Sequence, residues 1–209
     1  MNENRKLQKS KTEYYKQLLE ELNLYVKETD PKLKRIEKSI SSYNAYLANF
    51  ETPNLPFDSI YQNIKKVTPI FNPTRFNTKT IEVLKTTGDI KLMPKAIRNL
   101  LVSLDNQQNL YYEVNDVNYG LYLNTAKDAY LINVFSIQKM LVNQEQLSNA
   151  LNIKTSLADQ IAKLHLAITL KNFAEKNEIN SLKDNLNITH ELKNMIEKEV
   201  SSLINDSFE

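Results

Sequence analysis

The stretch Leu33-Lys-Arg-Ile-Glu-Lys-Ser-Ile-Ser-Ser-Tyr-Asn-Ala-Tyr-Leu-Ala-Asn-Phe50 decides the fold class of this protein. Its large apolar side chains recur in alternating steps of three and four residues, at Leu33, Ile36, Ile40, Tyr43, Leu47 and Phe50. This spacing places them in one row along a helix of about 3.6 residues per turn. It predicts an amphipathic helix that begins near Pro31, because proline suits the first helical position.

The same period continues upstream of Pro31. Over Asn4–Lys27 one apolar row is formed by Leu7, Tyr14 or Tyr15, Leu18, Leu22 and Tyr25. Thr29-Asp30-Pro31 interrupts the pattern, since proline disfavours a helical conformation at the residue before it. Residues 1–50 are therefore predicted to form an antiparallel helical hairpin, with Pro31 at its joint.

Residues 51–93 are predicted to contain short helices and proline-rich loops. The two short helices are expected over 57–66 and 78–86. Gly88 follows the apolar residues Ile81, Val83 and Leu84, and a glycine in this place commonly ends a helix in the left-handed conformation. Pro94 then opens the next helix, so Gly88 and Pro94 are predicted to have structural roles.

Residues 94–209 are predicted to form a bundle of longer helices. The first carries a row of apolar residues at Ile97, Leu101, Leu104, Tyr111, Val114, Val117 and Leu121, which is expected to face the core. This helix either continues through Gly120 or breaks there. Gln108 lies on this row and needs a partner or a looser layer of packing. Further helices are expected over 137–151, from Ser156 and from Asn177. The chain as a whole, residues 1–209, is predicted to be one all-α domain, an irregular bundle of about seven helices.

The composition excludes several classes of protein. With 2 glycines and 6 prolines, the sequence lacks the turn residues of a β-sandwich and the glycine-rich loops of a doubly wound fold. The 27 basic and 25 acidic residues nearly balance, so we expect no nucleic-acid partner. There is no cysteine, which rules out disulfides and thiolate ligands.

The titratable residues form no catalytic motif. His190-Glu191 resembles the start of a zinc-protease helix, but Asn194 stands where the second histidine is required. His165 is interpreted as an ordinary helix residue, and Glu197 and Glu199 cannot share a helical face. Lys85-Thr86-Thr87-Gly88 lacks the preceding glycine-rich cradle of a phosphate loop. We therefore expect a non-enzyme without catalytic, cofactor-binding or metal-binding residues.

Tyrosine is the notable aromatic residue, with 11 in the chain. Most of them stand near the predicted helical rows, and we interpret them as the rim of a helical core. An amphipathic pocket or interface is the alternative, because tyrosine combines apolar area with a polar tip.

Two segments resemble an uncharacterised bacterial family of proteins with a single N-terminal membrane helix. The first is Asn2-Glu3-Asn4-Arg5-Lys6 with the charged helix after it, which resembles the junction that follows the membrane helix in that family. The second combines Asn72-Pro73-Thr74, Lys85-Thr86-Thr87-Gly88-Asp89-Ile90 and Ile97-Arg98-Asn99-Leu100-Leu101. Together they cover about the first 115 residues, and this chain lacks the membrane helix and any tryptophan.

The resemblance implies that this chain is a soluble fragment of an inner-membrane protein. It also implies that the helix over 4–27 continues the deleted membrane helix outward and that the domain is extracytoplasmic. Because the family has no described activity, no functional residue is carried over. We expect a sensory or protein-interaction domain that binds a protein partner or self-associates. The alternatives are a homo-oligomeric scaffold that uses the rows Leu33–Phe50 or Leu7–Tyr25, and an enzyme of unknown class.

Overall fold

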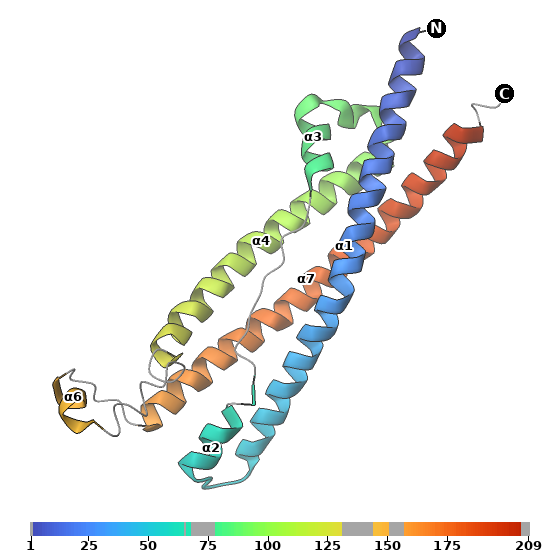
Figure 1. The fold of residues 1–209 in the computed structure, drawn as a ribbon. Coiled ribbons are helices and arrows are strands. Elements are labelled where there is room, and N and C mark those ends of the chain that lie inside the picture. The colour runs from blue at the N-terminus through green and yellow to red at the C-terminus, as the bar shows by residue number, and fades with distance from the viewer. Residues whose placement is uncertain (1, 65, 68–77, 131–143, 151–156, 206–209) are drawn as a thin grey trace. The chain divides into compact units, whose positions relative to one another are not determined.

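The computed structural model describes residues 2–64, 66–67, 78–130, 144–150 and 157–205, and their regular structure is entirely helical. The α-helices are α1 (Asn2–Ala48), α2 (Phe57–Ile64), α3 (Lys79–Thr87), α4 (Lys95–Tyr130), α6 (Glu145–Ala150) and α7 (Leu157–Asn205) (Figure 1). Two short 3-10 helices, η1 (Asn49–Glu51) and η2 (Asp89–Leu92), follow α1 and α3. The predicted all-α class is confirmed for this part of the chain.

The chain divides into two compact units. Unit 1 contains Met1–Lys34, Thr74–Glu113 and Ile179–Glu209, and unit 2 contains Arg35–Pro73 and Val114–Glu178. The long helices α1, α4 and α7 each supply one segment to each unit. Three helices thus continue from one unit into the other. The single domain over residues 1–209 stays a prediction.

The predicted hairpin over residues 1–50 is replaced by one continuous helix, because α1 runs through Pro31 without ending. Proline removes the hydrogen bond to the carbonyl of Lys27, which costs about 3 kcal/mol in a helix interior. Lys27 and Pro31 are both exposed, so this carbonyl lies on the solvent side of α1. On the opposite side the buried Thr29 donates its hydroxyl to the Tyr25 carbonyl at 2.7 Å, and Lys32 is buried as well. Packing on the inner side thus outweighs the local defect.

Another expected helix end is also absent, because α7 continues through Asn177, where a new helix was expected to begin. Of the two alternatives at Gly120, the structure shows the continuous helix, since α4 runs through this residue. The helix predicted over 137–151 is described only from Glu145 to Ala150, and the expected N-cap Ser156 lies outside the described residues. Six α-helices are therefore present in the described residues.

Unit 1 is built around one apolar cluster. Its buried members come from α1, α3, α4 and α7, with Met93 from the connection between η2 and α4: Tyr15, Leu18, Leu22, Ile81, Leu84, Met93, Ile97, Leu101, Leu104, Leu192 and Ile196. Tyr15, Leu18 and Leu22 of the predicted row over 4–27 are thus buried, as is the predicted row in the first half of α4. Burying each such side chain contributes roughly 1.5–3 kcal/mol, so this cluster stabilises unit 1.

Gly88 and Pro94 lie at two helix ends in unit 1. Gly88 ends α3 with φ 79°, in the left-handed conformation that was expected of it. Pro94 precedes α4, and its carbonyl accepts the first-turn hydrogen bond from Arg98 N–H at 3.0 Å. Between them, Asp89 accepts a hydrogen bond of 2.7 Å from the Tyr14 hydroxyl of α1, which fixes η2 against that helix.

Unit 2 has two smaller apolar clusters. One joins α1 and α7 with the end of α2, through Tyr43, Tyr46, Ile64, Val67, Leu164 and Ile168. The other joins α4 and α7 through Tyr122, Ala126, Ala167 and Ala174. In the second cluster the alanines of α7 pack with Tyr122 and Ala126 of α4, and the partly buried Tyr119 packs against them.

Candidate functional site

A buried polar trio links α1 and α7 in unit 2. The Lys171 ammonium donates to Ser39 Oγ at 2.6 Å and to Glu175 Oε1 at 2.6 Å. The Ser39 hydroxyl in turn donates to Glu175 Oε2 at 2.7 Å. The trio is closed, because each of its side chains bonds to the other two, and all three residues are buried.

A serine beside a lysine can be a nucleophile with its base, but this trio favours a structural role. A base must accept the serine proton, whereas Lys171 Nζ donates to Ser39 Oγ and the Ser39 hydroxyl donates to Glu175 instead. Burial raises the pKa of Glu175, an effect that Lys171 and Ser39 oppose by stabilising the carboxylate. Buried charges of this kind persist where they are paired and hydrogen-bonded.

His165 belongs to an aromatic cluster between α1 and α7. Its Nδ1 lies 2.8 Å from the Tyr46 hydroxyl, and the rings of Tyr46 and Phe50 both pack against the imidazole. Burial raises the pKa of Tyr46 to about 12, so its hydroxyl stays protonated and can donate to His165. His165 is therefore a packed and hydrogen-bonded residue, whereas His190 is exposed on α7.

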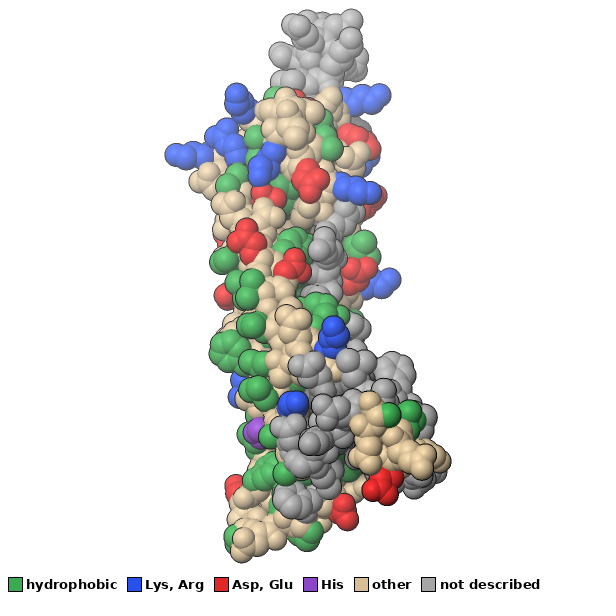
Figure 2. Space-filling model, turned by 90° about the vertical axis from the view of Figure 1, so that its left-hand side faces the viewer, with side chains coloured by type: hydrophobic (Ala, Val, Ile, Leu, Met, Phe, Trp, Pro, Cys, Tyr) green, Lys and Arg blue, Asp and Glu red, His purple; other side chains and the backbone are tan. Residues whose placement is uncertain are grey.

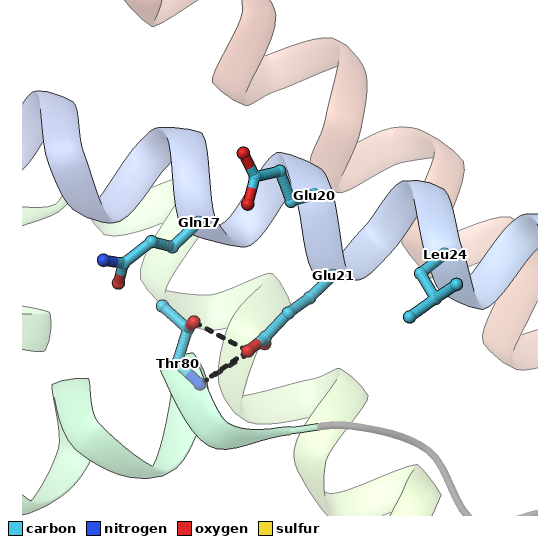
Figure 3. Close-up of a pocket in the computed structure, with 5 residues that line it drawn as sticks. All are labelled: Gln17, Glu20, Glu21, Leu24 and Thr80. Carbon is cyan, nitrogen blue, oxygen red and sulfur yellow. Dashed lines mark hydrogen bonds between the residues drawn. The ribbon is translucent and has the colours of Figure 1, made fainter.

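A shallow hollow of about 400 Å³ in unit 1 is lined by Gln17, Glu20, Glu21, Leu24 and Thr80 (Figure 3). The Glu21 carboxylate accepts hydrogen bonds from the backbone N–H of Thr80 at 3.1 Å and from its hydroxyl at 2.8 Å. Thr80 lies in the first turn of α3, where N–H groups lack helical partners and negative charge is favoured. Glu21 thus caps α3 from a neighbouring helix. The other acidic residue that lines the hollow, Glu20, is exposed.

The segment Lys85–Gly88 is also occupied by structural contacts. Lys85 forms an ion pair with Asp105 of α4, and the hydroxyls of Thr86 and Thr87 donate to the Val83 carbonyl of their own helix. These contacts leave no side chain of the segment for a phosphate. Within the described residues, no group of three acidic or histidine side chains is arranged to hold a metal ion.

The apolar row predicted along α4 changes sides after Tyr111. Ile97, Leu101, Leu104 and Tyr111 are buried as expected, but Val114, Val117 and Leu121 are 40%, 63% and 53% exposed. Three residues cover about 300° of a helix, so a residue three positions later lies about 60° short of a full turn. Val117 follows Tyr111 by two such steps and therefore lies about 120° away from it around α4. The buried side instead continues through Asn115, Tyr122 and Ala126. The inward assignment of these three residues is therefore wrong.

A second exposed row lies on α7. Leu166 and Phe173 are 52% and 59% exposed, and the partly exposed Leu170 lies between them at helical spacing. Phe173 lies five residues after the buried Ile168, and a step of five residues turns it about 140° away around the helix. Leu166 and Phe173 directly precede Ala167 and Ala174, which pack against α4.

The two exposed rows lie on the same flank of the α4–α7 contact. In unit 2, α4 and α7 run in opposite directions (Figure 1). In an antiparallel pair, the residues that directly precede the contact residues turn toward the same side of both helices. Leu121 precedes Tyr122 as Phe173 precedes Ala174. We name the residues of these rows the apolar face: Val114, Val117 and Leu121 of α4, and Leu166, Leu170 and Phe173 of α7.

This arrangement inverts the usual distribution of side chains. Asn115 and Asn172 are buried in unit 2 while the valines and leucines of the apolar face meet solvent. Figure 2 shows hydrophobic side chains at the surface on the side of the molecule that it draws. Single exposed apolar residues are ordinary, but contiguous rows commonly mark interaction sites. The apolar face is therefore the best candidate functional site in the described residues.

The sequence rows proposed for self-association are largely used inside the molecule. Tyr15, Leu18, Leu22 and Tyr25 are buried, and the side chain of Leu7 lies outside the described residues. In the row Leu33–Phe50, Ile36 and Tyr43 are buried, and only Leu47 and Phe50 are substantially exposed. The apolar face was missed because its α4 residues were assigned to the core.

Comparison with protein-family models, with curated proteins and with solved structures finds no match for this chain. No helix among the described residues is both long and apolar enough to cross a lipid bilayer.

Proposed function

We propose that this chain is a non-enzymatic, helical protein-interaction domain that binds its partner through the apolar face. The observation that carries the proposal is the pair of exposed rows on one flank of α4 and α7 in unit 2. The polar clusters, by contrast, have structural explanations: the trio around Lys171 closes on itself, and Glu21 caps α3.

The same proposal places the domain in a membrane-anchored bacterial protein. Its support is the resemblance of residues 2–6 and 72–101 to the family described above, in which a membrane helix precedes the domain. In this view α1 continues that helix, and the domain is extracytoplasmic and has a sensory or adaptor role. A reporter fused after Glu209 of the full-length protein tests the orientation, and activity of a cytoplasmic reporter would contradict it.

Site-specific photo-crosslinking in native cells tests the interaction itself. A photoreactive residue at Leu121 is expected to form a discrete adduct that disappears when Leu166→Glu is added on the neighbouring row. The same residue at Val83, which is 45% exposed on α3 in unit 1, serves as the control and is expected to form none. The proposal fails if Leu121 forms no adduct, or if its adducts match those of Val83.

A further inference from the structure

We infer that the partner of the apolar face is a second copy of this chain, so that two α4–α7 pairs meet and form a four-helix bundle. The inference rests on the proposed function and names its partner. Its basis is the geometry of the face, its lack of charge, and its area.

The geometry suits a second helix pair. An antiparallel helix pair with an apolar row on each helix presents a two-row face, and packing a second such pair against it gives the ordinary four-helix arrangement. In a two-fold dimer each copy uses the same patch, so one face on each copy is sufficient. The apolar face meets this condition because its two rows belong to one unit and lie on one flank.

The charges on and around the face also suit a second copy. None of its six side chains is ionisable, and Asp116 lies more than 90° around α4 from Leu121. Lys171 is buried against Ser39 and Glu175 on the other side of α7. Lys163 borders Leu166 at one end of the face, so a two-fold arrangement with antiparallel α7 helices holds the two Lys163 side chains at opposite ends. The face itself is therefore uncharged, and the exposed Glu113, four residues before Val117, and Lys176, three residues after Phe173, border it.

The exposed area agrees with what a stable dimer requires. Five of the six side chains are 40–63% exposed, and at on the order of 100 Å² each they leave about 500 Å² of apolar surface. A standard interface buries about 800 Å² on each partner, and in homodimers about 65% of this is apolar, which is also about 500 Å².

Sedimentation of the whole chain tests the inference. From about 1 to 300 µM we expect the mass to rise from that of the 24.3 kDa monomer toward twice that value. Leu121→Glu and Phe173→Glu should each raise the dissociation constant at least about 10-fold, because each buries a charge at the centre of the interface. Val83→Glu, on a side chain of similar exposure in unit 1, should leave the constant unchanged.

Cross-linking supplies a second readout that does not depend on affinity. The chain has no cysteine, so Leu121→Cys and Val83→Cys each provide a single thiol. With a short bis-maleimide, Leu121→Cys is expected to give a covalent dimer at concentrations where sedimentation shows association, and Val83→Cys is expected to stay monomeric. Circular dichroism of each variant shows whether the helical fold is kept.

The inference is overturned if the wild-type chain stays monomeric up to 300 µM, or if Leu121→Glu and Phe173→Glu, still helical, associate like the wild type. It is equally overturned if Val83→Glu disrupts association as strongly as they do. If the chain is monomeric in sedimentation but a photoreactive residue at Leu121 forms an adduct with another protein in cells, the proposed function stands and the partner is a different protein. If the chain is monomeric and no such adduct forms, both the inference and the proposed function fail.

Discussion

Unit 1 and unit 2 use the same three long helices but are stabilised in different ways. Unit 1 has one large apolar cluster that draws on four helices, and its polar contacts include Glu21 with Thr80 at the start of α3 and the buried Lys32 with Tyr111 between α1 and α4. Unit 2 has two smaller clusters and a buried ion pair, and it leaves the apolar face in solvent. The difference indicates that unit 1 buries the apolar rows of its helices, while unit 2 leaves two apolar rows in solvent.

The largest expected effect breaks the ion pair of unit 2. Lys171→Met leaves the Glu175 carboxylate buried without its cation, and such changes cost about 3–5 kcal/mol. Urea unfolding followed by circular dichroism measures the loss. Lys176→Met, at an exposed position of the same helix, is the matched control and should change stability by less than about 0.5 kcal/mol. Equal free energies of unfolding for the two variants would show that the trio does not stabilise unit 2.

A cavity in the core of unit 1 should have the next largest effect. Leu101 is completely buried, and Leu101→Ala is expected to lower the free energy of unfolding by about 2–5 kcal/mol. Its neighbour Val102 is 38% exposed, so Val102→Ala should have a far smaller effect in the same urea titration. A small loss for Leu101→Ala would show that unit 1 depends less on its apolar cluster than its packing indicates.

The ion pair also predicts how stability depends on pH. Folding raises the pKa of Glu175 through burial, and a carboxyl of this kind loses stabilising free energy as the pH rises through its folded pKa. Lys171 opposes this shift, so its removal should enlarge the loss and move it to higher pH.

The destabilisation caused by Lys171→Met should therefore grow as the pH rises above the ordinary pKa of a glutamic acid, by up to about 1.4 kcal/mol per pH unit. Unfolding titrations at several pH values measure this growth. In a Lys171→Met/Glu175→Gln variant neither titratable group of the trio remains, although the buried Glu178 stays nearby, and the difference from wild type should not show the same growth. A destabilisation by Lys171→Met that stays constant with pH would contradict the assignment to Glu175.

The smallest expected effects have opposite signs in the two units. Gly88→Ala in unit 1 should cost about 1 kcal/mol, because alanine is strained at φ 79°. Gly120→Ala in unit 2 should stabilise α4 by about 0.5–1 kcal/mol, since glycine is unfavourable within a helix. An added Cβ meets nothing within 4 Å at either site, so backbone conformation alone sets each sign. Thermal melts of the two variants measure the difference, and shifts in the same direction would contradict it.

Local patterns in the sequence were sufficient for several features. The steps of three and four residues predict helices throughout, and the described residues are helical wherever regular structure occurs. Gly88 in the left-handed conformation and Pro94 before α4 follow from the chemistry of single residues. The candidate site, by contrast, could be predicted only in part, because the sequence places Val114, Val117 and Leu121 on a helix without showing which side of it is covered.

What the sequence by itself determined is therefore the helical class, the ends of α3 and the beginning of α4, because these depend on backbone conformation within a few residues. Only the tertiary structure decided that α1 continues through Pro31 and that α4 turns Asn115 and Tyr122 inward, leaving Val117 and Leu121 in solvent. Both outcomes depend on packing against segments that are distant in the chain. Such contacts can outweigh a local defect of about 3 kcal/mol at a proline, and they choose which of two helical rows is buried.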